Sequence, residues 1–252
     1  MEKERKKQII KLSIAIIAFA IIIILVATVM IRYQVEGDKN MPFNLSKIIL
    51  ISTAEGNEKE EDDKEKQRWN FDIEQNNDVY FYIDKNEEYK GKEKTIKGVV
   101  IENINITKAP NKGEIKVFMP NSVDGRIYEN SDEFVVNESL EYKGGTESNP
   151  KTLEIGRNGG SALIRFSNVG IGEYTSNKDK QITHDGTLLN KVDVSTEDAA
   201  FTVNFDLVIK VDNCKYRANI SLDMPCGNIT EEGTCSIEKT DMSDVIFKRE
   251  SI

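Results

Sequence analysis

An uninterrupted apolar run near the amino terminus constrains this chain more than any other feature. Residues 12–31 contain no charged side chain over twenty positions. At about 1.5 Å of rise per residue, a helix of that length spans the roughly 30 Å hydrocarbon layer of a bilayer. A helix buried in a soluble core usually keeps a polar face, and this run has none. The run therefore predicts a transmembrane helix, to which we assign residues 9–31.

The charges that flank the run predict its orientation. The acidic residues Glu36 and Asp38 follow the run. The tail before it is mostly basic, with Lys3, Arg5, Lys6, Lys7 and Lys11. Cytoplasmic flanks are enriched in Lys and Arg, so residues 1–8 are expected in the cytoplasm and everything after the helix outside. The chain has a net charge of -9 and its first 32 residues carry +4, which leaves -13 for the remainder. Such an acidic exported part argues against binding to nucleic acid, which requires a basic surface.

A cleaved signal peptide is the main alternative to a permanent anchor, because it also combines a basic start with an apolar run. The small-x-small site Ala18-Phe19-Ala20 is followed by further apolar residues rather than by a polar mature start. We therefore favour an uncleaved signal anchor in a single-pass protein of the cell membrane, with the lipid bilayer as the partner of the helix. Cleavage after Ala27 is the alternative.

Beyond a predicted linker at residues 32–42, the hydrophobic pattern has a period of two, which is typical of strands. The clearest examples are residues 201–211 and 216–224, which a turn-length connection joins into a predicted hairpin. Residues 47–53 form an apolar, β-branched run of strand length, and residues 69–73 and 79–83 alternate. Further strands are predicted at residues 95–106, 114–119, 133–136, 161–167 and 245–248.

Many short strands with one polar face predict a mainly β fold, because parallel α/β sheets need wholly apolar strands with helices between them. The exported part, residues 43–252, is expected to be an antiparallel β-sandwich-like domain. It is interpreted as one domain, with a possible split near residues 143–152.

The sequence predicts no catalytic residues, cofactor or metal site. The single histidine, His184, lies in a polar turn, and no nucleophile elbow accompanies it. Glu61, Asp62 and Asp63 lack the glycine-turned loop of a calcium site. The glycine-rich residues 155–160 lack the Gly-Lys-Ser/Thr ending of a phosphate-binding loop and are interpreted as a turn.

The three cysteines are disulfide candidates if they lie outside the membrane. Their spacings, twelve residues from Cys214 to Cys226 and nine from there to Cys235, contain no C-x-x-C knuckle and so do not favour zinc. Three thiols allow one bridge within the chain. We favour Cys226 with Cys235, which closes a short loop; a bond from Cys214 to either of them and a fully reduced set are the alternatives.

Six tyrosines are candidates for a carbohydrate or peptide groove: Tyr80, Tyr82, Tyr89, Tyr128, Tyr142 and Tyr174. Five Asn-x-Ser/Thr sequons also occur, at Asn44, Asn105, Asn137, Asn219 and Asn228. However, abundant Asn, Lys and Ile with scarce Arg are typical of an AT-rich bacterial gene, in which sequons arise by chance.

These features favour a membrane-anchored bacterial surface protein that binds an envelope protein or polymer, or has a structural role there, rather than an enzyme. One alternative is an anchored extracytoplasmic hydrolase that uses two carboxyl groups as acid and base. Another is a subunit of an export or fibre assembly.

Overall fold

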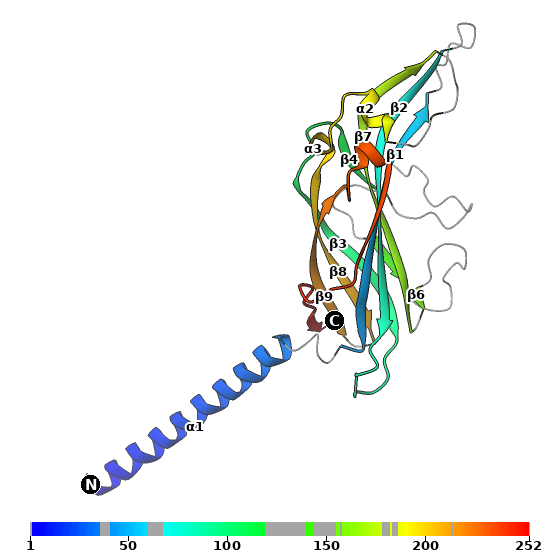
Figure 1. The fold of residues 1–252 in the computed structure, drawn as a ribbon. Coiled ribbons are helices and arrows are strands. Elements are labelled where there is room, and N and C mark those ends of the chain that lie inside the picture. The colour runs from blue at the N-terminus through cyan, green and yellow to red at the C-terminus, as the bar shows by residue number, and fades with distance from the viewer. Residues whose placement is uncertain are drawn as a thin grey trace.

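The computed structural model describes residues 2–35, 41–59, 68–118, 140–143, 155–156, 158–177, 182, 186–212 and 214–251. It consists of one long helix, α1 (Glu2–Val35), followed by a mainly β fold in two antiparallel sheets (Figure 1). Within α1, residues Ile10–Met30 have a mean hydropathy of 3.1 and none is buried. Both parts of this arrangement, the apolar amino-terminal helix and the antiparallel β fold, confirm the sequence predictions.

The larger sheet has six strands, and the smaller has five. The order in the larger sheet is β10 (Thr234–Lys239), β1 (Phe43–Glu58), β2 (Trp69–Lys85), β7 (Gly159–Ser176) and β4 (Glu114–Phe118), with β6 (Ile155–Gly156) also paired to β7. The order in the smaller sheet is β11 (Lys248–Ser251), β9 (Cys214–Met224), β8 (Phe201–Val211), β3 (Ile96–Lys108) and β5 (Leu140–Lys143). The predicted β8–β9 hairpin is confirmed, because Val211 pairs with Cys214 and Phe201 with Met224.

Some strand predictions differ from the structure, and one is not tested by it. Residues 69–73 and 79–83 belong to one continuous strand, β2, because the polar residues between them pair with both neighbouring strands. The prediction for residues 245–248 is wrong: β11 begins at Lys248, and the residues before it form a turn in which the Val245 N–H donates to the Met242 carbonyl. The prediction at residues 133–136 lies outside the described residues.

The possible split near residues 143–152 falls mostly outside the described residues. Strands from before and after it nevertheless combine in both sheets, since β2 pairs with β7 and β3 pairs with β8. Figure 1 shows the resulting two layers, with the carboxyl terminus beside the end of the domain nearest α1.

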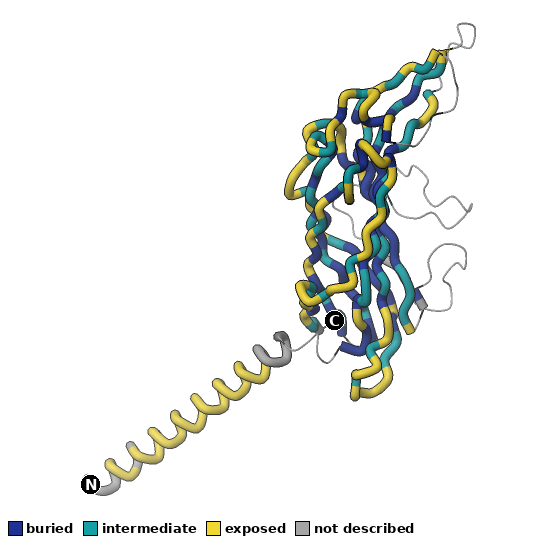
Figure 2. Tube along the Cα trace, in the orientation of Figure 1, coloured by how far each residue is buried: buried dark blue, intermediate teal, exposed yellow. Residues whose placement is uncertain are grey.

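The inner faces of the two sheets contribute to one hydrophobic core. At its centre the rings of Phe81 and Phe205, from opposite sheets, meet edge to face with centroids 5.6 Å apart, and Phe166 stacks on Phe205 at 6.2 Å. Aromatic pairs at such separations add to the free energy gained from burial alone. Figure 2 shows that buried positions run along the strands of both sheets, in contrast to the exposed described part of α1.

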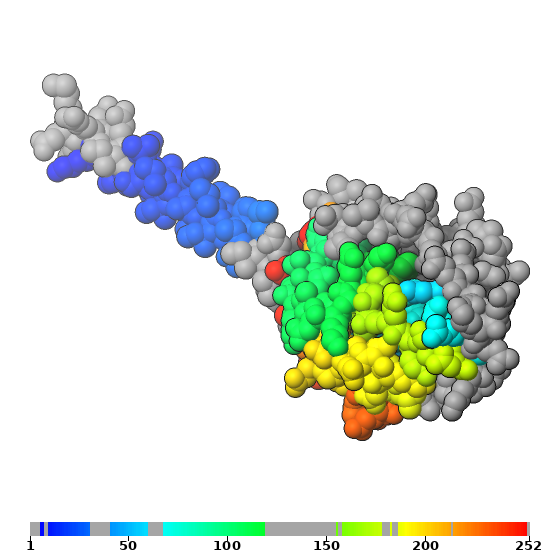
Figure 3. Space-filling model, turned by 90° about the horizontal axis from the view of Figure 1, so that it is seen from above, coloured from blue at the N-terminus to red at the C-terminus, as the bar shows by residue number. Residues whose placement is uncertain are grey.

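Three one-turn helices, α2 (Thr187–Lys191), α3 (Thr196–Ala199) and α4 (Ile229–Glu232), lie at the end of the domain far from α1 (Figures 1 and 3). Leu188, Leu189 and Ile229 pack with residues of β1 and β2 into a second, smaller core. A capping box between Ser195 and Asp198 fixes the start of α3. Helices of four or five residues are too short to show a 3.6-residue period, which explains why the sequence pattern did not predict them.

Candidate functional site

The outer face of the six-stranded sheet brings together two of the predicted tyrosines. Tyr80 lies in register between Ile49 of β1 and Leu163 of β7, and Tyr82 lies beside Lys47. These positions alternate with the inward-facing core residues of the same strands, so their side chains share the outward face. Ile49, Tyr80 and Tyr82 are each partly exposed. We call Lys47, Ile49, Tyr80 and Tyr82 the tyrosine face.

Charged side chains surround these rings. The Lys47 ammonium lies 4.8 Å from the centroid of the Tyr82 ring and 3.2 Å from Glu238 Oε1. Next to Tyr80, Arg165 donates two hydrogen bonds to the Asp78 carboxylate, at 2.7 and 2.8 Å. Both side chains of that pair are mostly buried, with 16% and 14% exposed, so the pair ties β2 to β7.

The phenol of Tyr80 is held neutral. Burial raises its pKa above the ordinary value, and the negative charge of Asp78 adds to the effect. A neutral phenol beside a second ring and a lysine offers an apolar surface, a hydroxyl group and a cation. These groups suit the faces and hydroxyls of sugars or an extended peptide.

The structure separates the other predicted tyrosines from this face. Tyr174 lies near the far end of β7, where Lys191 sits 4.8 Å from its ring centroid. Tyr89 lies in the turn that follows β2, and Tyr142 belongs to β5 of the other sheet. Tyr128 is outside the described residues. A single groove lined by all six tyrosines is therefore not formed.

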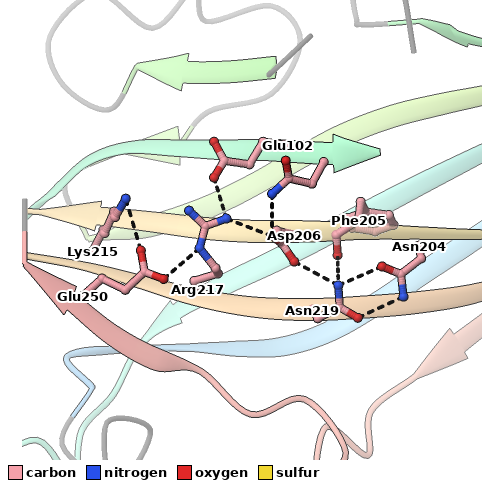
Figure 4. Close-up of polar contacts among 9 residues, drawn as sticks. Glu102, Asn204, Phe205, Asp206, Lys215, Arg217, Asn219 and Glu250 are labelled. Atoms are coloured by element: carbon pink, nitrogen blue, oxygen red, sulfur yellow. Dashed lines mark hydrogen bonds and ion pairs between the residues drawn. The ribbon is translucent and has the colours of Figure 1, made fainter. Parts of the chain in front are cut away.

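The outer face of the five-stranded sheet has a different character, because its charges pair with one another (Figure 4). The Arg217 guanidinium on β9 contacts Glu102 on β3 at 2.5 Å, Asp206 on β8 at 2.9 Å and Glu250 on β11 at 2.9 Å. Lys215 adds a contact of 3.1 Å to Glu250. One arginine thereby links all four of these strands, a use that its planar, multi-donor group favours.

Amide side chains complete this network. Asp206 accepts hydrogen bonds from Asn103 at 2.8 Å and from Asn219 at 2.9 Å, and Asn219 also exchanges two with Asn204. Asn103 occupies an irregular point of β3 with a φ of 57°, a conformation that asparagine tolerates well. Burial alone would raise the pKa of Asp206, but the hydrogen bonds from Asn219, Asn103 and Arg217 outweigh it and lower that pKa. The pKa of Glu250 is lowered in the same way, by Lys215 and Arg217 against burial.

These carboxylates are poorly suited to proton transfer. A general acid at neutral pH needs a raised pKa. Among the described carboxyl groups with a resolved shift, every pKa is lowered: Glu93, Asp198, Asp206, Asp241 and Glu250. The network on the five-stranded sheet is therefore a structural clamp.

A row of buried polar side chains crosses the six-stranded sheet between the two hydrophobic cores. We call Ser52 of β1, Gln75 and Asn77 of β2 and Asn168 of β7 the polar belt; each has no exposed surface. Asn77 is its hub: its Oδ1 accepts from Ser52 Oγ at 2.7 Å and from Gln75 Nε2 at 2.9 Å, and its Nδ2 donates to the Phe166 carbonyl at 3.1 Å. The sequence analysis did not anticipate this feature, although its signal is the polar stretch inside an alternating strand.

The remaining candidates contribute little to a site. His184, Glu61, Asp62 and Asp63 lie outside the described residues. Within the glycine-rich residues 155–160, Ile155 of β6 pairs with Gly160 of β7 and Gly156 pairs with Gly159. There Gly159 has a φ of 125°, and a Cβ at this position would lie 2.3 Å from the Ile83 carbonyl oxygen. In the described part of the chain, no group of three or more His, Cys, Asp or Glu side chains is arranged to hold a metal ion.

The cysteines fall into two locations, and all three are free thiols. Cys214 is buried at the start of β9, whereas Cys226 and Cys235 lie next to each other beside β1. Burial, together with the contact with Cys226, raises the pKa of the Cys235 thiol to about 11. The comparisons supply no additional guide to these residues: no family model, curated protein or solved structure matches the chain.

Proposed function

We propose that the protein is a single-pass membrane protein of the bacterial surface whose β-sandwich domain lies outside the cytoplasm and binds an envelope protein or polymer. The observation that carries the proposal is α1. Its span Ile10–Met30 is long enough to cross a bilayer and is exposed along its whole length, so the β domain does not bury it. A helix this apolar requires a nonaqueous environment, which a bilayer supplies.

The charges support the proposed orientation. The basic residues before the span would remain in the cytoplasm, and the acidic remainder of the chain would be exported. The short distance from the end of α1 at Val35 to the start of β1 at Phe43 would hold the domain close to the membrane. Tethering raises the effective concentration of a binding surface for partners in the same envelope, so even a weak site can be occupied.

The two outer faces of the domain differ in how well they are suited to binding a partner. On the five-stranded sheet, Arg217 satisfies three carboxylates of its own chain, and a partner would have to break those contacts. The tyrosine face instead offers two partly exposed tyrosine rings, a residue type that is enriched at protein interfaces. We assign the binding role to the tyrosine face.

Two experiments test the proposal. Protease added to intact cells should remove the domain and spare only the helix with its cytoplasmic tail; a carboxyl terminus that stays protected until lysis, or is found in the medium, contradicts the anchored topology. Purified full-length protein should cosediment with isolated envelope polymer or bind envelope proteins, and a Tyr80→Ala/Tyr82→Ala variant should bind at least tenfold more weakly. Tyr174→Ala, at the far end of β7, is the matched control and should bind normally. Equal binding by the two variants, or no binding by the wild type, refutes the assignment.

A further inference from the structure

Two cysteines converge on one point of β1 from different parts of the chain. Cys235 on the edge strand β10 is the register partner of Ser52 on β1. The backbone N–H of Cys226 donates to the Ser52 hydroxyl at 2.9 Å, and its thiol donates to the Leu50 carbonyl at 3.6 Å. The Cys235 side chain contacts that of Cys226.

The residue that follows Cys226 leaves room for this contact. Gly227 has a φ of 60°, and a Cβ at that position would lie 2.3 Å from Cys235 Sγ. Any other residue would therefore displace the sulfur of Cys235. The backbone of this turn lets the second thiol approach the first.

The third cysteine is too far away to take part. Cys214 and Met224 stand at opposite ends of β9, whose eleven residues extend about 33 Å at 3.3 Å per residue. Cys226 follows Met224 by two residues, and Cys235 lies beside it. Because a disulfide joins Cα atoms less than about 7 Å apart, Cys214 cannot reach either thiol without unfolding.

We propose that Cys226 and Cys235 are a redox pair whose disulfide ties the turn and α4 to the edge strand β10, while Cys214 stays a thiol. Ile229 of α4 is fully buried in the second core, and the Glu231 carbonyl lies directly against Gly186 beside α2. A bond between the two sulfurs would therefore fix the segment that covers this end of the domain. The pairing follows from the geometry of the chain and does not depend on where the domain resides.

The oxidant is a low-molecular-weight disulfide such as oxidised glutathione, or the disulfide of an exchange enzyme. The thiolate of Cys235, the more exposed of the two, attacks one sulfur of the oxidant and releases one equivalent of thiol. The thiolate of Cys226 then attacks the sulfur of Cys235 in this mixed disulfide and releases the second thiol. The protein loses two hydrogens, and one disulfide oxidant becomes two thiols.

Peptide mapping tests the proposal on the purified full-length protein. The protein is equilibrated with glutathione mixtures of increasing oxidation, unreacted thiols are alkylated under denaturing conditions, and the protein is digested. Trypsin places Cys226 and Cys235 together in residues 218–239 and Cys214 in residues 211–215. The expected result is that residues 218–239 lose two hydrogens and take up no alkyl group, while Cys214 is alkylated.

A second protease and two variants make the outcome decisive. Cleavage after Glu231 or Glu232 separates the two cysteines, whose fragments should then remain joined until a reductant is added. Cys214→Ser should leave the bond intact, whereas Cys235→Ser should abolish it together with any difference in melting temperature between oxidised and reduced protein. Alkylation of both Cys226 and Cys235 at every glutathione ratio, or a bond that contains Cys214, overturns the proposal.

Discussion

Replacing Asn77, the hub of the polar belt, should destabilise the domain far more than the small size of this side chain suggests. In Asn77→Ala, the hydroxyl of Ser52, the amide of Gln75 and the carbonyl of Phe166 each lose a hydrogen bond inside a site without exposed surface. Gln75 is affected most, because its Oε1 already has no partner within the described chain. At about 1 kcal/mol for each hydrogen bond, the expected loss in the free energy of unfolding is about 3 kcal/mol.

The assay is urea or thermal unfolding of the full-length protein in detergent, followed by the fluorescence of the only tryptophan, Trp69. For a domain of about 200 residues, 3 kcal/mol corresponds to a fall in melting temperature of about 6–12 °C. Asn204→Ala is the matched control, since it also removes a hydrogen-bonded asparagine from within a strand, but at the surface. Water replaces its partner there, and the expected loss is below about 0.5 kcal/mol. Equal losses in the two variants would refute the role assigned to the polar belt.

Three further results are expected. Because the pKa of Cys235 is raised to about 11, its alkylation by iodoacetamide should accelerate about tenfold per pH unit between roughly pH 7 and 10; a plateau below pH 9 would contradict this. Arg217→Met should cost about 1–2 kcal/mol at pH 7 in urea unfolding. This loss of unfolding free energy should become smaller in acid, because the pKa values of Asp206 and Glu250 are lowered in the folded state. The two carboxylates stabilise the fold fully above their ordinary pKa values of 3.8 and 4.5. Their stabilisation is lost as the pH falls through the lowered pKa values of the folded state. A cost that is absent at pH 7 or unchanged in acid would argue against the clamp. Four lysines in place of the isoleucines at residues 21–24 should oppose membrane insertion by about 10–14 kcal/mol and release the protein on alkaline extraction, whereas four leucines should not.

Strands with an apolar face along their whole length could be predicted from the sequence. In β8 every second residue from Phe201 to Val211 faces the core, and β9 repeats this pattern after a short turn, so local alternation alone indicated the hairpin. The apolar span of α1 was equally plain, because no polar residue interrupts it.

The centre of β2 shows why local pattern fails elsewhere. Gln75 and Asn77 occupy positions at which the alternating pattern of β2 predicts apolar residues. Taken without the rest of the fold, two polar residues at these positions are more typical of a turn. Gln75 donates to Asn77, and the other partners of Asn77 are Ser52 on β1 and the Phe166 carbonyl on β7, which lies 89 residues beyond it in the sequence. A polar residue can occupy a buried strand only when distant strands supply its partners, and the sequence of the strand itself does not reveal them.

Edge elements were missed for a related reason. β10 is mostly exposed and is held by pairing with β1 along one side, so its residues show no apolar alternation. The position of this strand also supports the proposed pairing of two of the cysteines. Spacing alone left three pairings open, whereas the register that sets Cys235 beside Ser52 brings it to Cys226 and leaves Cys214 at the other end of β9.

In the proposed topology, the two outer faces of the acidic domain would differ in how they meet partners near a membrane. On the five-stranded sheet, Arg217 and Lys215 already pair with Glu102, Asp206 and Glu250, so a partner would compete with contacts within the chain. That network also holds β11, the last strand, at the end of the domain nearest α1. Tyr80 and Tyr82 lie partly exposed on the outer face of the opposite sheet. In the proposed topology the anchor would restrict this surface to partners within reach of the membrane, and shape and stacking rather than net charge would determine which of them bind.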